Sequence, residues 1–315
     1  MACYFRYLWG KSEHMRQWIL SLFVVISVLP VAAQRQLGTV KPGNTGMNAQ
    51  KPFEHTAGTY VVINGINMYY EQYGNGKPLL LIHGNGGSGH DFDAQLQTLS
   101  RKFKVIVPDS RAQGNTGNQS DSLTYELMAE DYYLLLQHLQ LDSVFVLGWS
   151  DGGIIGLILA KDYPGTVSKL AISGVNLQPD STALMPEFID YAHLQLRQAE
   201  DSLKAGKKSF ETTKDLLHLV LYHPDIAPED LKDIQIPVLV ISGDHDLVKM
   251  EHTLAIFQAL AQSQLAIFPG SSHAVLQESP QLFNNTIIRF FMREFADTNP
   301  MQFIEQPASN QVEEE

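Results

Sequence analysis

Short apolar runs alternate with helical patterns over most of this chain. Several of the runs are unbroken, which is typical of parallel strands that helices cover on both faces. Strands are expected at 59–63, 66–72, 79–82, 104–107, 144–147, 170–173, 238–242 and 264–268. Helices are expected at 91–100, 123–140, 152–163, 251–261 and 280–295. This alternation predicts an α/β fold with a doubly wound, mostly parallel eight-stranded sheet and right-handed crossovers.

One stretch interrupts the alternation. Residues 176–235 hold helical patterns at 185–204 and 209–222, and no strand pattern. A helical insertion of this kind lies between two strands, at the edge of the sheet where ligands usually bind. We therefore expect a helical cap at 176–235, over a core formed by 57–175 and 236–297.

The two ends of the chain fall outside the core pattern. Residues 34–56 lack periodicity and predict a flexible leader, and 298–315 predict a solvated acidic tail. At the start, three basic residues precede the uncharged run 18–29, and small residues follow up to Ala33. This pattern is typical of a secretory signal peptide, 1–33, cleaved after Ala33. A membrane anchor is the alternative, but the run is shorter than the roughly 20 apolar residues that span a bilayer.

Charge and cysteine content narrow the range of partners. The chain has 22 Lys and Arg against 34 Asp and Glu, a net charge of −12. Residues 1–33 hold three basic residues and one acidic residue, so their removal leaves 19 against 33, or −14. A chain with this excess of negative charge is poorly suited to bind nucleic acid or an anionic membrane surface. The single cysteine, Cys3, can form neither a disulfide framework nor a cysteine-based zinc site. We expect an exported protein, periplasmic or secreted, that has no stable membrane anchor after cleavage.

A candidate nucleophile lies between a strand and a helix. The residues Gly148-Trp149-Ser150-Asp151-Gly152 match Gly-x-Ser-x-Gly after strand 144–147 and before helix 152–163. In this context the pattern predicts a nucleophile elbow, in which a tight turn exposes the serine hydroxyl beside a helix N-terminus. The alternative is an inert serine in a glycine-rich turn.

Further motifs follow other strands in a fixed order. They are His83-Gly84, Asp109-Ser110-Arg111, Gly243-Asp244-His245-Asp246 and Gly270-Ser271-Ser272-His273. With the elbow, they make residues 57–295 resemble the α/β-hydrolase fold superfamily. The elbow is most similar to those of the valacyclovir hydrolase and biphenyl-hydrolase-like serine hydrolases. Ala112 stands where relatives often have glycine, which we expect to change a loop and leave the chemistry intact.

The resemblance implies a catalytic triad. In this fold the triad follows the chain order serine, acid, histidine, which favours His273 as the base. His83 competes for that role, but its position indicates that it shapes the oxyanion loop. Asp246 is favoured over Asp244 as the acid, by resemblance to a Gly-[Asp/Glu]-x-Asp pattern. No carboxylate follows strand 170–173, where some relatives place the acid.

The remaining candidate site residues are those expected to stabilise the oxyanion or to bind the substrate. We expect the backbone N–H groups of Asn85 and Asp151 to form the oxyanion hole. The glycine-rich loop that holds Asn85 lacks the Lys-Ser/Thr of a phosphate-binding loop. Trp149 and Asp151 are candidate substrate-binding residues. Resemblance to an amino-acid-ester hydrolase suggests that the Asp151 carboxylate pairs with a substrate amine, and the alternative is a role in complementing the helix dipole.

Metal and cofactor sites are not expected. His90-Asp91-Phe92-Asp93 and Asp244-His245-Asp246 contain ligand residue types, but neither has a recognised zinc framework. We interpret the first as the start of a helix. The sequence therefore predicts an exported serine hydrolase that cleaves a carboxylic ester or related acyl bond of a small molecule through an acyl-enzyme. A carbon–carbon bond hydrolase with the same triad, or a non-catalytic binding protein on this fold, is the alternative, and the oligomeric state is left open.

Overall fold

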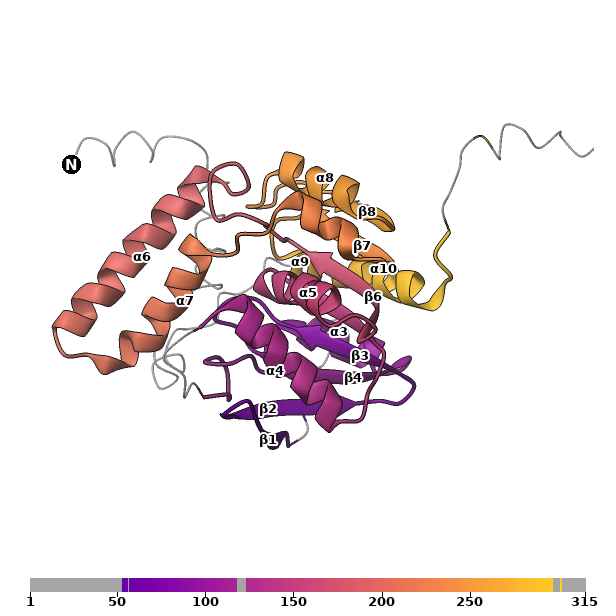
Figure 1. Cartoon of the computed structure of the whole chain (residues 1–315), viewed down its shortest axis with the longest axis horizontal. Coiled ribbons are helices and arrows are strands. Elements are labelled where there is room, and N and C mark those ends of the chain that lie inside the picture. Colours follow the sequence, from indigo (N-terminus) through magenta and orange to yellow (C-terminus); the bar gives the residue numbers. More distant parts are fainter. Residues whose placement is uncertain (1–52, 56, 118–122, 297–300, 302–315) are drawn as a thin grey trace, which may run out of the picture.

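A single twisted sheet forms the centre of the computed structural model, which describes residues 53–55, 57–117, 123–296 and 301 (Figure 1). Its eight strands follow the order β1-β2-β4-β3-β5-β6-β7-β8. They are β1 (Thr59–Ile63), β2 (Ile66–Tyr73), β3 (Lys77–Ile82), β4 (Phe103–Pro108), β5 (Val144–Trp149), β6 (Val167–Ser173), β7 (Val238–Gly243) and β8 (Ser263–Phe268). Strand β2 is antiparallel to both neighbours, and the strands from β4 to β8 pair in parallel. The predicted α/β fold is confirmed.

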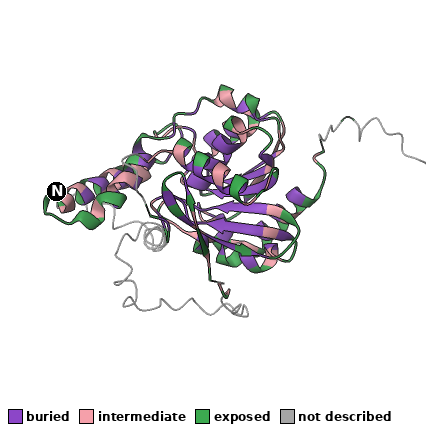
Figure 2. Ribbon diagram, turned by 60° about the horizontal axis from the view of Figure 1, so that its bottom comes forward, coloured by how far each residue is buried: buried purple, intermediate pink, exposed green. Residues whose placement is uncertain are grey.

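Helices cover both faces of this sheet because its strand side chains alternate between two apolar cores. Leu80 and Ile82 point into a core shared with α4, α5 and α8, whereas Leu79 and Leu81 pack against α3, α9 and α10. These helices are α3 (Asp93–Leu99), α4 (Tyr125–His138), α5 (Asp151–Asp162), α8 (Met250–Ala259), α9 (Val275–Glu278) and α10 (Pro280–Met292). Figure 2 shows the resulting layers, with buried strands between helices whose outer sides are exposed.

Two further helices leave the layered core between β6 and β7. They are α6 (Pro186–Lys204) and α7 (Glu211–Tyr222), and they project together to one side of the sheet in Figure 1. Ala192, Leu196 and Ala199 of α6 pack against Leu217 and Leu221 of α7, so the pair has a small core of its own. The 3-10 turns η3 (Lys208–Phe210) and η4 (Pro228–Asp233) complete this region.

Some boundaries differ from the expectation. The helix expected at 91–100 is a 3-10 turn, η2 (Gly89–Phe92), followed by α3. Strand β6 begins at Val167 instead of 170, because its first residues pair with β5 although Ser168 and Lys169 interrupt the apolar pattern. Residues 53–55, inside the segment expected to be a leader, contact the core: Phe53 packs edge-on against Tyr73.

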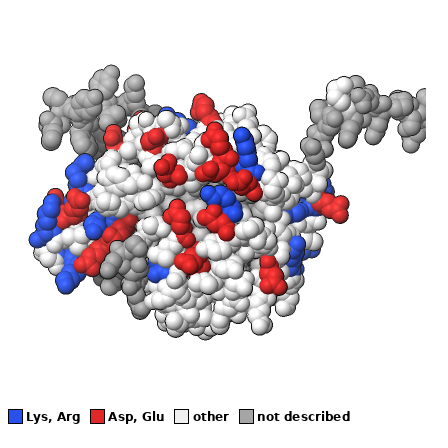
Figure 3. Space-filling model, viewed as in Figure 1, with Lys and Arg blue, Asp and Glu red and all other residues white. Residues whose placement is uncertain are grey.

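The expected signal peptide, most of the leader and nearly all of the acidic tail lie outside the described residues. Within the described part of the chain, no helix is both long and apolar enough to cross a membrane. On the face of the molecule in Figure 3, Asp and Glu side chains are widespread and Lys and Arg are interspersed among them.

Candidate active site

Ser150 lies in a tight turn between β5 and α5. Its backbone has φ 55° and ψ −123°, in a region that residues with a side chain rarely adopt. The turn also needs the glycines beside it. A Cβ at Gly148 would lie 2.2 Å from the Gly152 carbonyl oxygen, and a Cβ at Gly152 would lie 2.0 Å from the Ile82 carbonyl oxygen. The local geometry is that of a nucleophile elbow packed against the end of β3.

Three side chains from three separate loops meet at this turn. The Ser150 hydroxyl oxygen lies 3.0 Å from Nε2 of His273, which follows β8. The Nδ1 atom of His273 lies 2.7 Å from Oδ1 of Asp246, which follows β7. The Asp246 carboxylate also accepts bonds from the Val248 N–H at 3.0 Å and the Ser242 hydroxyl at 3.3 Å. This arrangement can deprotonate the serine and stabilise the imidazolium that results.

The competing residues are engaged elsewhere. Asp244 is exposed, accepts the Ser271 N–H at 3.2 Å and a backbone hydrogen bond from Gly270, and contacts the neighbouring His245. The buried His83 accepts the Ser110 N–H at Nε2 and donates from Nδ1 to the Gly84 carbonyl. Its ring therefore joins the loops after β3 and β4, and its role in shaping an oxyanion loop stays a prediction.

The expected oxyanion residues lie beside the serine. Asp151 is the first residue of α5, so its N–H has no acceptor within the helix. The loop after β3 passes close to the elbow, since a Cβ at Gly84 would lie 3.2 Å from the Ser150 Cβ. Asn85 follows in this loop, and its side-chain amide donates to Asp151 Oδ2 at 2.9 Å. Their contribution to catalysis stays a prediction.

Comparison with known proteins identifies the family. A family model for the alpha/beta hydrolase fold matches residues 77–228. Human "Serine hydrolase BPHL" is 32% identical over 229 residues, which cover 68% of this chain and 79% of that protein. The chain belongs to the α/β-hydrolase superfamily. A putative carbamate hydrolase, RutD, from Caulobacter sp. is 28% identical over 261 residues, 73% of this chain and 97% of that protein.

Solved α/β-hydrolase structures share the same fold. The enol-lactonase from Burkholderia xenovorans LB400 superposes with a TM-score of 0.62 at 22% identity, covering 75% of this chain and all of that one. At this identity the likeness concerns the architecture alone.

In this hydrolase, a cleft lined by both polar and apolar side chains lies at Ser150. Its polar lining includes Asn85, Tyr125, Asp151 and Asn176. The Asp151 carboxyl is buried, and burial raises its pKa above the usual range although hydrogen bonds from Asn85 and Tyr125 oppose the shift. Tyr125 and Asn176 are not predictable from the sequence, because neither belongs to a motif and only the packing of α4 and of the loop after β6 brings them here.

The apolar lining of the hydrolase cleft comes mostly from the cap, between β6 and β7. Leu184, Phe188, Ala192, Leu217 and Val220 line it, together with Leu247 from the loop that holds Asp246. Asn85 connects α7 to the elbow, because its amide donates to the Leu216 carbonyl of α7 at 3.2 Å as well as to Asp151.

Trp149 lines the same cleft and also supports the histidine. Its indole N–H donates to the His273 carbonyl at 2.9 Å, and the two rings lie 5.7 Å apart. The residue therefore holds the backbone of the His273 loop, a contact that gives it a structural role beside its expected one in binding substrate. In the part of the chain that the structure describes, His55, His90 and Asp93 form a separate cluster of metal-ligand residue types.

Proposed function

We propose that this chain is a serine hydrolase that cleaves a carboxylic ester or related acyl bond of a small molecule. The observation that carries the proposal is the hydrogen-bonded chain from Ser150 through His273 to Asp246. A serine hydroxyl is a weak nucleophile unless an adjacent base takes its proton, and this geometry supplies that base and its orienting acid.

The reaction would proceed in two halves. The Ser150 oxygen bonds to the carbonyl carbon while His273 takes the hydroxyl proton, and the carbonyl electrons move to an oxyanion beside the N–H groups of Asn85 and Asp151. Collapse of this intermediate breaks the bond to the leaving alcohol, which takes the proton from His273. Water then gives a proton to His273 and attacks the acyl-enzyme, which releases the acid and returns the proton to Ser150.

The acidic residue in the cleft lining favours an acyl group that carries an amine. Asp151 lines the cleft next to the nucleophile, and its buried carboxyl accepts hydrogen bonds from the neutral side chains of Asn85 and Tyr125. Among the described residues, it forms no salt bridge. An ammonium group would compensate this buried charge. The net charge of −12 would also favour the approach of a cationic substrate over an anionic one. We infer that amino-acid esters are a preferred substrate class.

Export is part of the proposal and rests on the pattern of 1–33. If the segment is a cleaved signal peptide, the exported protein has Gln34 as its first residue. Amino-terminal sequencing of protein recovered from outside the cytoplasm, after expression of the full chain, checks this. An intact amino terminus in the exported fraction would contradict it.

A covalent serine probe tests the enzyme assignment. A fluorophosphonate should label the wild-type protein at Ser150 and should not label Ser150→Ala. The same variant should lose ester hydrolysis by a factor on the order of 10⁶ in kcat, the loss seen when a triad serine is removed from another hydrolase. Circular dichroism of the variant controls for folding. Absence of labelling in a folded wild-type protein would favour a binding protein on this fold.

A further inference from the structure

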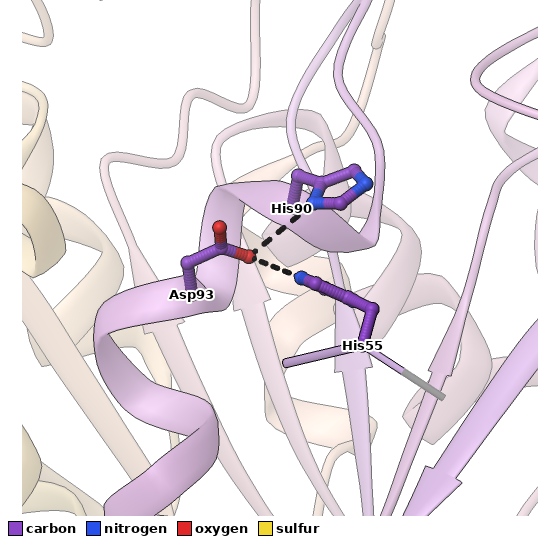
Figure 4. A group of neighbouring side chains, drawn as sticks. All are labelled: His55, His90 and Asp93. Carbon is purple, nitrogen blue, oxygen red and sulfur yellow. Dashed lines mark hydrogen bonds and ion pairs between the residues drawn. The ribbon is translucent and has the colours of Figure 1, made fainter. Parts of the chain in front are cut away.

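Three potential metal ligands converge outside the cleft, where none of them lines the active site. They are His55 from the segment before β1, His90 of η2 and Asp93 at the start of α3 (Figure 4). His55 Nε2 lies 2.9 Å from Asp93 Oδ1, and His90 Nδ1 lies 3.5 Å from the same oxygen. One ligand atom from each residue lies within 4.8 Å of the other two.

The orientation of His55 is set from its other side. Its Nδ1 atom lies 2.8 Å from Oε2 of Glu71, a buried residue of β2. The Tyr69 hydroxyl donates to Glu71 Oε1 at 2.6 Å, and Phe53 packs edge-on against the imidazole. Metal-binding histidines usually donate their second ring N–H to a carboxylate in this way, which fixes the ring and makes the free nitrogen a better ligand.

We propose that His55, His90 and Asp93 bind one divalent transition-metal ion, with zinc as the best fit to two imidazoles and a carboxylate. Tetrahedral zinc with bonds of about 2.0–2.1 Å requires ligand atoms about 3.3 Å apart. The observed separations, from 2.9 Å up to 4.8 Å, span that value. His90 and Asp93 have side-chain exposures of 62% and 49%, so small rotations can close the site. Water would take the fourth position.

An ion pair without a metal explains only part of the cluster. His55 bridging Glu71 and Asp93 needs no third residue, yet the His90 ring lies 4.1 Å from the His55 ring and directs Nδ1 toward the same Asp93 oxygen. The spacing of His90 and Asp93 places both on one helical turn, facing His55. Metal binding would thus tie the segment before β1 to the start of α3, a structural role distinct from ester cleavage.

Zinc titration of the untagged protein tests this site. After removal of metals with a chelator, calorimetry with Zn²⁺ should show one bound ion per chain. His90→Ala and Asp93→Asn should each weaken zinc affinity by about 100-fold or more. Losing a residue that only supports a metal ligand already costs about 10- to 100-fold in metal affinity. His138→Ala removes another exposed histidine, on α4, and should bind zinc as the wild type does.

Thermal unfolding adds a readout that activity does not provide. Zinc should raise the melting temperature of the wild type and of His138→Ala, and should leave that of His90→Ala unchanged, because a ligand that binds only the folded state stabilises it. The proposal is overturned if His90→Ala binds zinc as tightly as the wild type, or if the wild type shows no stoichiometric binding.

Discussion

Two aspartates in one short loop have opposite surroundings, and this difference should decide their roles. Asp246 contacts His273 Nδ1 and has a side chain that is 1% exposed, whereas Asp244 lies at the surface with His245 as its neighbour. In a serine protease, changing the triad aspartate to asparagine lowers kcat about 10⁴-fold, because the amide selects the wrong imidazole tautomer. Asp246→Asn should show a loss of that order in ester hydrolysis.

Asp244→Asn is the matched control for this prediction. It changes the same residue type two positions away and should retain nearly all of the wild-type kcat, because its side chain does not contact His273. If both variants melt like the wild type and Asp244→Asn loses more activity than Asp246→Asn, the assignment of Asp246 as the triad acid is wrong.

Asp151 should affect substrates according to whether they carry an amine. Asp151 lines the cleft, and its backbone N–H keeps the same place whatever the side chain is. Asp151→Asn should lower kcat/KM for an amino-acid ester by about 10-fold or more, or ~1.4 kcal/mol, because a desolvated charge pair is lost. The same variant should leave kcat/KM for the matching ester without an amine nearly unchanged. Equal losses on both esters would leave Asp151 a structural role only.

At the scale of elements, a buried histidine joins α8 to the loop after β6. His252 of α8 accepts the Leu177 N–H at 2.9 Å through Nε2. Burial lowers its pKa below the usual 6.5, although Asp180 acts in the opposite sense. The folded state therefore binds this proton less readily than the unfolded state does. The contribution of neutral His252 to the free energy of unfolding is therefore fully present above about pH 6.5. It is lost as the pH falls toward the folded-state pKa.

The His252→Gln variant isolates that effect. Between pH 7 and pH 5, the unfolding free energy of the wild type should fall more steeply than that of the variant, by up to about 1.4 kcal/mol per pH unit for one proton. Urea denaturation at several pH values measures both slopes. Parallel slopes would mean that protonation of His252 does not contribute to the loss of stability.

At the scale of the whole molecule, one buried ion pair connects the first hairpin to the helical layer. Arg111 forms two bonds with Asp131 of α4, from Nε at 2.7 Å and Nη2 at 2.6 Å. Arg111 also donates to the Asn64 carbonyl in the turn between β1 and β2, and the Asn64 amide donates to Asp131. Both charged side chains are almost completely buried. The charge of each is therefore compensated chiefly by the opposite charge of the other.

Removing one partner should therefore cost more than removing both. Arg111→Met should lower the unfolding free energy by about 3–5 kcal/mol, because Asp131 would remain buried without its cation. Arg111→Met combined with Asp131→Leu should recover much of that loss, since two apolar side chains can replace the pair. Denaturant unfolding of the wild type and three variants, including Asp131→Leu alone, measures the coupling. A double variant less stable than Arg111→Met would contradict this account.

The sequence predicts most of the strands because the relevant signals are local. A strand buried on both faces reads as a continuous apolar run, and β3, β5 and β7 do so. The start of β6 was missed because Ser168 and Lys169 lie at a half-buried end of the strand. The turn η2 was missed because Ser88 caps a short 3-10 segment where an unbroken helix was expected.

For the candidate site, the sequence by itself determined the family fold and predicted that Ser150, Asp246 and His273 meet, with Asp246 preferred to Asp244 by resemblance to the family's pattern. Each of the three residues follows a strand, and parallel strands end at the same edge of the sheet, so their meeting could be expected from the chain order. Only the tertiary structure decided what surrounds them. Tyr125 reaches the cleft through the packing of α4, and Phe188 reaches it through the cap. His55 meets Asp93, 38 positions away, by packing alone, because contacts between residues with no shared periodicity arise only when the layers assemble.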